Sequence, residues 1–508
     1  MNVIKSLILG SAASLLAFGG AQAADLPVKA KAVEYVKVCS LYGAGFYYIP
    51  GSDTCIKLGG YIRADTTFNG ALYDSPLWQG GAGGNGLNTK DYFITRARFN
   101  LNEDTRTATE YGVLRTFANV QMQWSQNVDS VGSSGYLAVD FAFIQFAGFT
   151  FGKAVSQFDP QWTLSRPTIS SGFNQGSNDA TGITQLAYTA SFGNGVSGTL
   201  SLENAASYRQ AGVYNTANFI VGPGAASYLT ANYGVSTNTF LGNSTGGNHM
   251  PDVVGNVRLD QAWGSLHFGA AFHDITSGFY GSDESTGHPD DAYGYAITGA
   301  IEFKNIPTGT GDSVKIEAAY ADGAAKYVFG GTTDTSGAGR YASFQGNSLG
   351  FGYVLDGVFG TGGQIQTSKA WEISAYYEHY WNPNWRTSLF GNYSHISYGS
   401  SGDALLFAAF GGGNRLGYSS NATTGSLAGN LNANGSFDLG LAQIGTRTAW
   451  TPVKNLTLSA EFLYSRMDQN LNGTYTSTAS GVSGKSAQTY TLKDQNLYNG
   501  SVQIMRSF

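Results

Sequence analysis

Several segments of the chain alternate between apolar and polar residues, and this period of two constrains the possible folds more than any other feature. In Ile56–Asp65, for example, Leu58 and Ile62 share one face, whereas Arg63 and Asp65 share the other. Successive side chains of a β-strand point to opposite faces of its sheet, so the pattern indicates strands. No run of about 18 apolar residues, the length typical of a membrane-spanning helix, occurs after residue 23. An all-β fold is therefore expected.

The connections between the candidate strands alternate in length. Short ones such as Gly193-Asn194 and Asn382-Pro383 interleave with long ones such as 206–251 and 322–369. Strands with one apolar and one polar face, short periplasmic turns and long external loops are typical of transmembrane β-barrels, whose closure leaves no unpaired edge in lipid. The sequence therefore predicts a 16-stranded antiparallel transmembrane β-barrel over residues 56–508. Its strands are expected near 56–68, 91–102, 110–124, 136–147, 148–154, 183–192, 195–205, 252–263, 264–275, 292–303, 312–321, 370–381, 384–394, 437–450, 455–466 and 496–508.

The composition favours one large β-structure in a membrane over a soluble protein. Only 12% of the residues are charged, 70 are Gly, and no Pro-rich or charged linker divides the chain. A soluble β-sandwich would turn its polar faces outward, and a propeller would show a repeat of about 40–50 residues, which we do not find. The formal net charge of −6 is mild and the basic residues are scattered, so nucleic acid is not an expected partner.

The N-terminal residues are typical of an export signal. Lys5 precedes an apolar run over 7–18, which is too short for a spanning helix of about 20 residues, and Ala21-Gln22-Ala23 follows. We expect residues 1–23 to be a signal peptide that is removed by cleavage after Ala23.

The segment that follows this signal is expected to lie in the periplasm. Residues 24–55 contain Cys39 and Cys55, the two cysteines of the chain. An oxidising compartment favours their pairing as a disulfide, which closes a small loop before the first strand.

Several motifs match those of a known family. The sequence resembles the general porins of alphaproteobacteria, of the rhizobial type, over nearly the whole chain after the signal. The matching segments are Cys39–Cys55, Leu58–Arg63 (LGGYIR), Arg106–Gly112 (RTATEYG), Phe149–Lys153 (FTFGK), Pro251–Gly264 (PDVVGNVRLDQAWG), Glu378–Ser388 and Arg447–Asn455 (RTAWTPVKN). The resemblance implies an outer-membrane homotrimer of sixteen-stranded barrels in contact with lipid and lipopolysaccharide, each with an aqueous pore narrowed by its third external loop. Phe508 is the terminal aromatic residue of such barrels, but Arg506 stands where enteric porins have an aromatic residue.

The third external loop and the strands near it carry the candidate pore residues. Chain order places the loop at about 155–182, and we expect its Asp159 and Asp179 to face a basic wall across the lumen. The predicted basic wall consists of Arg63, Arg96, Arg98, Arg115 and Lys153, and the other predicted pore-lining residues are Asp65, Arg258, Asp260 and Glu461. The four arginines come from three consecutive strands and are expected near mid-strand, as one patch. Charged groups and bore together would filter small hydrophilic solutes.

An alternative interpretation is that these arginines pair with carboxylates such as Asp65 or Asp140 and only stiffen the wall. The charge of the chain without its signal, 27 − 34 = −7, predicts a weak cation preference, although a basic wall opposes it. Loop charges act only near the mouth, because screening limits their range to about 8–10 Å.

The expected function is a water-filled channel for passive diffusion of small hydrophilic solutes and ions, without cofactor, metal or catalysis. One alternative is a channel specific for sugars or oligosaccharides, and another is a structural or adhesive barrel with a plugged lumen. A barrel lipase or protease would need a serine beside a histidine that an acid or amide orients. His273-Asp274 is the best candidate for that chemistry, whereas the spacing of the histidines does not suggest a metal site.

Overall fold

The computed structural model describes residues 37–70, 91–125, 136–170, 176, 181–204, 211–216, 244–281, 283–330, 340–411, 429–477 and 488–508. The predicted signal peptide with its cleavage site at Ala23, the segment 24–36 and Asp179 lie outside these ranges.

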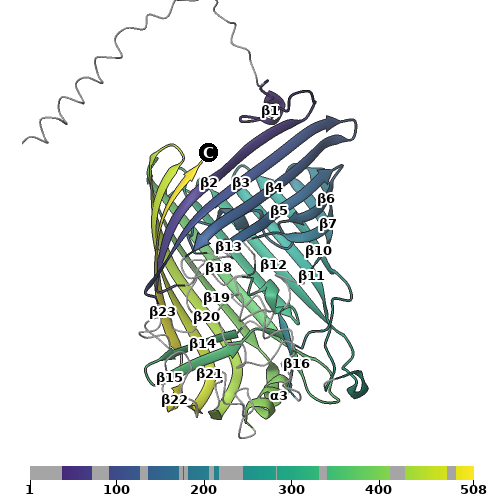
Figure 1. Cartoon of the computed structure of the whole chain (residues 1–508), viewed down its shortest axis with the longest axis vertical. Helices are drawn as coiled ribbons and strands as arrows, with labels where there is room; N and C mark the ends of the chain where they lie inside the picture. Colours follow the sequence, from purple (N-terminus) through teal and green to yellow (C-terminus); the bar gives the residue numbers. More distant parts are fainter. Residues whose placement is uncertain are drawn as a thin grey trace, which may run out of the picture.

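Sixteen antiparallel strands of the described chain form a closed barrel (Figure 1), as predicted. They are β2 (Cys55–Phe68), β3 (Phe93–Thr109), β4 (Gly112–Ser125), β5 (Tyr136–Phe146), β6 (Phe149–Ala154), β7 (Ile183–Gly193), β8 (Val196–Glu203), β10 (Asp252–Gln261), β11 (Gly264–Ile275), β12 (Ala292–Lys304), β13 (Ser313–Asp322), β18 (Lys369–Asn382), β19 (Trp385–Ser397), β20 (Gly429–Val453), β21 (Leu456–Ser477) and β23 (Gln495–Ser507). Each strand pairs with its neighbour along the wall, and β2 closes the barrel against β23 from Tyr61↔Ser507 to Phe68↔Gly500.

The remaining elements belong to the connections. They are β1 (Tyr47–Tyr48), β9 (Gly212–Asn215), β14 (Arg340–Gln345), β15 (Ser348–Tyr353), β16 (Leu355–Phe359), β17 (Gln366–Thr367), β22 (Thr489–Leu492), the short helices η1 (Ser40–Tyr42), η3 (Gln161–Ser165), η4 (Glu284–Thr286) and η5 (Ala325–Tyr327), and α3 (Gly399–Gly411). None of the helices in the described ranges is long and apolar enough to cross a membrane.

Tight turns at one end of the barrel set the register of the hairpins. Asn194, with a φ of 50°, and Gly195, with a φ of 77°, connect β7 to β8. Ala147, with a φ of 50°, connects β5 to β6 in the same way. Two-residue turns with positive φ match the twist of hairpin strands. The short turns therefore mark the periplasmic end, and the long connections at the other end are external.

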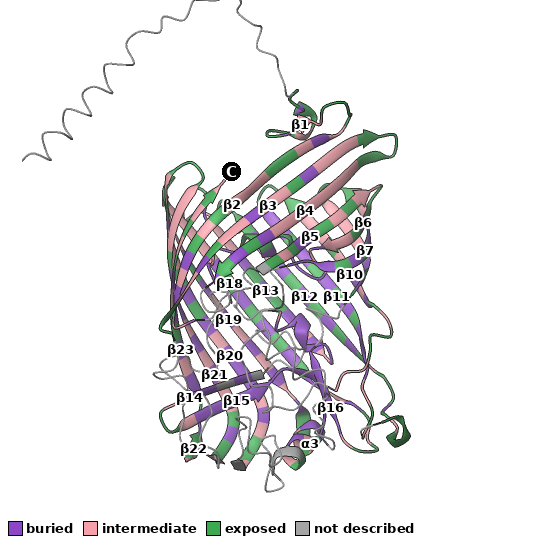
Figure 2. Ribbon diagram, viewed as in Figure 1, coloured by how far each residue is buried: buried purple, intermediate pink, exposed green. Residues whose placement is uncertain are grey.

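Apolar side chains cover the outer face of the wall, where Figure 2 shows exposed residues alternating with buried ones. Near the periplasmic turns this face carries tryptophans. Trp385 and Trp450 stack there with ring centroids 5.6 Å apart, and Trp381 is 66% exposed. Aromatic rings at this level are typical of the membrane interface of outer-membrane barrels.

The lumenal face is polar in its periplasmic half, but its external half carries apolar residues that the alternation of the strands did not indicate. Residues 211–216, 323–330, 340–368 and 398–411, which we call the loop cluster, share one apolar core with inward-facing residues of the wall. Those wall residues include the small or aliphatic Ala296, Ala319, Ala370 and Leu439. Folded loops must bury their apolar side chains against something, and this part of the wall provides the surface.

Residues 37–54, which we call the N-terminal knob, sit on the periplasmic end of β2, β3 and β4, and these strands extend past the rim of the barrel (Figure 1). The predicted disulfide between Cys39 and Cys55 is present, with Cα atoms 6.1 Å apart. Both cysteines are buried with Phe46 in a small core of the knob.

Candidate pore constriction

The third external connection, residues 155–182, is called L3, and its described residues, 155–170, 176, 181 and 182, fold into the lumen as predicted. Its first part is fixed to β8, β10 and β11. The carboxylate of Glu203 accepts hydrogen bonds from the backbone N–H of Gln157 and from the Ser156 hydroxyl, both at 2.7 Å. Asn256 donates to the Gln157 carbonyl at 2.7 Å, and a ring nitrogen of His267 lies 2.9 Å from the Phe158 carbonyl.

The next part of L3 is fixed to strands much farther around the wall. Lys315 on β13 donates to the Ser165 carbonyl at 2.8 Å, and Ser388 on β19 donates to the Pro167 carbonyl at 2.6 Å. Glu461 on β21 accepts from the backbone N–H groups of Ile169 and Ser170, the latter at 2.8 Å. L3 therefore follows the inner wall from β8 to β21.

Two further charged pairs lie near L3 and were not predicted from the sequence. Lys315 lies 3.7 Å from a carboxylate oxygen of Glu302, and the Arg447 guanidinium lies 3.0 Å from that of Glu378. All four residues face inward on their strands. Extending the period-of-two assignment through the later strands would have identified them, because each lies at an inward position of its strand.

The predicted acidic face of L3 is only partly described. Asp159 is buried at the start of the loop, where its backbone N–H donates to the Ser156 carbonyl at 3.1 Å. Arg166 of L3 donates to the Thr163 hydroxyl and carbonyl. Asp179 lies outside the described residues, so its position opposite the basic wall stays a prediction.

Three of the predicted basic residues come together on β2 and β3. Antiparallel register places Arg63 opposite Arg98 and Asp65 opposite Arg96, all on the lumenal face. Asp65 binds both Arg63 and Arg96 with N···O distances of 2.8 Å. Arg98 donates to the amide oxygen of Gln123 at 2.9 and 2.6 Å. We call Arg63, Arg96, Arg98 and Asp65 the arginine group; its ion pairs are those that the alternative interpretation predicted.

Arg115 does not belong to that group. The turn after Thr109 pairs Arg115 with Arg106, which is ten residues along β3 from Arg96, or about 33 Å at 3.3 Å per residue. Arg115 therefore lies near the periplasmic end. The prediction of one patch at mid-strand is wrong for Arg115, because the short turn between β3 and β4 fixes this residue as the fourth of β4.

Lys153 does not face the lumen either. Phe149, Phe151 and Lys153 alternate with the inward Thr150, and both phenylalanines are more than 40% exposed on the outer face. The Lys153 ammonium donates to the Val139 carbonyl at 2.7 Å. The prediction that Lys153 belongs to the basic wall is therefore wrong, because the alternation of β6 places this residue on the outer face.

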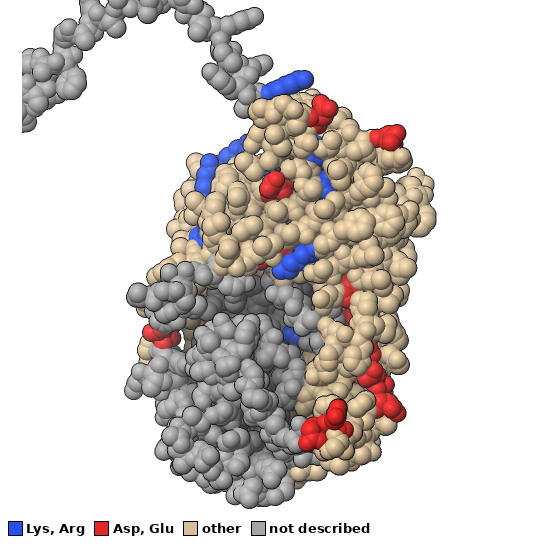
Figure 3. Space-filling view, turned by 45° about the vertical axis from the view of Figure 1, so that its right-hand side comes forward, with Lys and Arg blue, Asp and Glu red and all other residues tan. Residues whose placement is uncertain are grey.

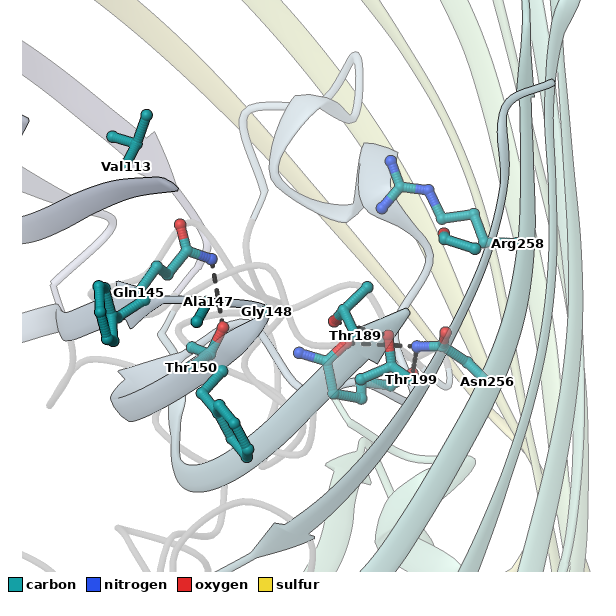
Figure 4. Close-up of a pocket in the computed structure, with 13 residues that line it drawn as sticks. Val113, Gln145, Ala147, Gly148, Thr150, Thr189, Thr199, Asn256 and Arg258 are labelled. Atoms are coloured by element: carbon teal, nitrogen blue, oxygen red, sulfur yellow. Dashed lines mark hydrogen bonds between the residues drawn. The ribbon is translucent and has the colours of Figure 1, made fainter. Parts of the chain in front are cut away.

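Arg258 and Asp260 face the lumen on β10 and form an ion pair of 2.8 Å. Arg258 also lines a polar recess of about 460 Å³ between L3 and the periplasmic turns (Figure 4). The recess is bordered by the hydroxyl groups of Thr150, Thr189 and Thr199 and by amides, among them Gln145, which donates to Thr150 at 3.2 Å. Within the described chain, no three His, Cys, Asp or Glu side chains gather as they would for a metal ion.

Known proteins resemble this chain in sequence and in fold. The family model described as "Porin subfamily" matches residues 25–501. The chain is 31% identical to Porin Omp2b of Brucella suis over 333 residues, which cover 59% of this chain and 81% of the relative. Porin Omp2b of Brucella melitensis is 30% identical over 336 residues with the same coverage. The outer membrane channel DcaP of Acinetobacter baumannii shares the fold, with a TM-score of 0.56 and 16% identity, over 91% of this chain and 99% of that structure.

Proposed function

Because the chain belongs to the porin subfamily and forms an outer-membrane channel for passive diffusion, we propose that solutes cross its narrowest part between L3 and the arginine group. The observation that carries the proposal is the position of the L3 contacts. Residues 156–170 bond to β7, β8, β10, β11, β13 and β19 to β21, and residues 181 and 182 bond to β5. The arginine group lies on β2 and β3.

The arginine group gives its side of the pore a positive charge. Three guanidinium groups and one carboxylate leave a net charge of 3 − 1 = +2. Asp65 holds two of the guanidinium groups in place. The arginines can therefore form these ion pairs and also line the constriction, so the two interpretations do not exclude each other. A fixed positive wall favours anions locally and offsets the weak cation preference expected from the charge of the whole chain.

Replacing Arg96 and Arg98 together with Ser tests this assignment. We expect the ratio of potassium to chloride permeability to rise about five- to thirtyfold, because each of the two unit charges, at 4–8 Å in water, contributes about 0.5–1 kcal/mol. The measurement is the reversal potential of single channels in a KCl gradient.

Arg506→Ser is the matched control. It removes one positive charge on the outer face, where Arg506 donates to the Lys454 carbonyl at 2.6 Å, and should leave the reversal potential unchanged. An unchanged potential in the Arg96/Arg98 variant would refute the constriction assignment, and an equal shift in the control would show that only total charge matters.

We propose further that three copies assemble in the membrane and contact lipid and lipopolysaccharide. The resemblance of the motifs to trimeric porins supports the oligomer, and the apolar outer face with its tryptophans supports the lipid contact. Migration of the unboiled protein on a denaturing gel, compared with the boiled protein, measures both the folded barrel and its oligomer.

The relatives imply a channel rather than an enzyme, and the surroundings of His273 agree with this. Its Nδ1 lies 2.7 Å from Asp252, and its Nε2 faces the carboxylate of Asp356 at 3.5 Å. A hydrolase would need a serine hydroxyl at that second nitrogen. His273 instead connects the wall to the loop cluster, where Asp356 accepts the backbone N–H groups of Ala211 and Ala325.

A further inference from the structure

A second basic cluster lies on the lumenal face of β2, β3 and β4 at the periplasmic end, well separated from the arginine group. It contains Arg106, Arg115, Asp104 and Lys57, and we call it the exit cluster. Register places Arg106 opposite Arg115 and Asp104 opposite Lys57. At about 3.3 Å per residue, Arg106 is about 26 Å along β3 from Arg98.

One carboxylate holds both guanidinium groups of the exit cluster. Arg106 donates to the two oxygens of Asp104 at 3.1 and 2.9 Å, and Arg115 donates to the same oxygens at 3.1 and 3.0 Å. Arg115 also donates through Nη1 to the amide oxygen of Gln145 at 3.0 Å. These bonds fix two planar cations side by side, and each side chain remains nearly 30% accessible.

Aromatic rings support each guanidinium from a different part of the chain. The N-terminal knob provides Tyr42 and Phe46, whose ring centroids lie 5.8 and 4.9 Å from Cζ of Arg106. The wall provides Phe117 and Phe143 at 5.3 and 5.5 Å from Cζ of Arg115. Stacking on aromatic faces holds an arginine fork in one orientation, so the cluster is organised before any solute arrives.

The exit cluster carries a net positive charge and borders an open space. Two arginines, Lys57 and Asp104 give 3 − 1 = +2, whereas the neighbouring Glu103 lies on the opposite face of β3. Lys and Arg gather toward the periplasmic end on the face shown in Figure 3, where Asp and Glu lie among them, and other Asp and Glu lie toward the external end. Gln145, which binds Arg115, also lines the polar recess of Figure 4.

We propose that the exit cluster is a binding site for the oxyanion group, phosphate or carboxylate, of solutes that leave the constriction toward the periplasm. Asp104 and, at Arg115, also Gln145 occupy only part of the five N–H groups of each guanidinium. The remaining N–H groups of the two arginines can donate to such an oxyanion. The site deepens the proposed channel function, on which it rests, by naming the charged solutes that pause at the exit.

The test uses the whole protein as single channels in a planar bilayer, with inorganic phosphate and succinate as separate probes in a chloride background. Each probe should reduce the chloride current in a saturable way, and at lower concentration from the periplasmic side than from the external side. In R106Q/R115Q we expect the half-blocking concentration to rise at least about tenfold, as is typical when charge-assisted hydrogen bonds are lost. Arg506→Gln, which removes an equal charge per substitution on the outer face, should leave it unchanged.

A second variant distinguishes the hydrogen-bonding geometry of the two guanidinium groups from their positive charge. R106K/R115K keeps both positive charges but cannot bind an oxyanion with two parallel N–H groups, so most of the block should be lost with it as well. Block by one probe alone identifies which oxyanion the site takes. Unaltered block in both double variants, with normal conductance in KCl, would refute the site but not the channel. A wild-type protein without conductance would instead refute the channel function.

Discussion

At the scale of single residues, Asp312 shows how a periplasmic turn is fixed. It ends the turn 305–312 and receives hydrogen bonds from His379 at 2.7 Å, from the Thr308 hydroxyl at 2.5 Å and from the Tyr380 backbone N–H at 2.9 Å. Burial alone would raise the pKa of Asp312, but these hydrogen bonds outweigh it and lower the pKa to about 2. The ionised carboxylate therefore stabilises the junction of β13 and β18.

The pH dependence of this contribution follows from the lowered pKa. It is fully present above the ordinary aspartate pKa of 3.8 and is lost as the pH falls toward about 2. We expect Asp312→Asn to destabilise the barrel by about 2 kcal/mol at pH 7, as is typical of hydrogen bonds to a charged group, and to have little effect near pH 2. The temperature at which the unboiled gel band disappears, measured after incubation at each pH, checks this.

Asp53→Asn is the control for that measurement, because it changes an exposed aspartate of the knob. It should leave the transition temperature unchanged at both pH values. An equal loss of stability in Asp312→Asn at pH 7 and near pH 2 would contradict the ionised state assigned to Asp312.

At the scale of elements, L3 is held by carboxylates that accept its backbone N–H groups, among them Glu203 near its start and Glu461 near its middle. Glu461 was predicted to line the pore, and the structure gives it a more specific contact with Ile169 and Ser170. Glu461→Gln keeps the shape but loses the charge, which weakens this attachment by about 1.5–3 kcal/mol. We expect larger current noise in the open state and an altered single-channel conductance, both measured in planar bilayers.

Glu284→Gln is a matched control, since Glu284 lies exposed in the external helix η4. Its open-state noise should equal that of the unmodified protein. Identical noise in Glu461→Gln and the control would show that L3 does not need this contact.

Strands were predictable from the sequence to the extent that one face of each meets lipid and the other meets water. The alternation of apolar and polar residues located all sixteen strands of the wall. However, β20 begins at Gly429, before the expected residue 437, and β21 ends at Ser477, after the expected residue 466. Their extra residues pair with each other outside the membrane and join the core of the loop cluster through Leu431 and Tyr475. Outside the membrane, contact with lipid does not require apolar and polar residues to alternate, so the sequence did not predict these extensions of the two strands.

The candidate site was predictable only where neighbouring strands are in simple register. The register of β2 and β3 brings Arg63, Arg96 and Arg98 together. Arg115 lies apart from them, because position along a strand depends on the turn that precedes it. Asp104, the carboxylate that joins Arg106 to Arg115, was not recognised because the expected strand ended at residue 102, whereas β3 continues to Thr109. A partner on the neighbouring strand can be identified only when the ends of both strands and their register are known.

At the scale of the whole molecule, the barrel contains two structures that depend on different forces. Backbone hydrogen bonds close the wall, while the loop cluster depends on apolar packing inside the external half of the lumen. Phe351 on β15 is buried in that packing, with its ring centroid 6.3 Å from Phe437 and 6.4 Å from Tyr353. A change there should loosen the loops and leave the wall closed.

Phe351→Ala tests this separation. The large-to-small change costs about 3–5 kcal/mol in a packed core, which we expect to appear as faster cleavage of the external loops by protease and as a higher single-channel conductance. The unboiled barrel should still migrate as the folded form, because none of the hydrogen bonds between its wall strands is removed. Phe272→Ala, on the outer face of β11 and 41% exposed, removes the same side chain from lipid and should change neither conductance nor cleavage. Loss of the folded gel band in Phe351→Ala would show instead that wall and loops fold as a single cooperative unit.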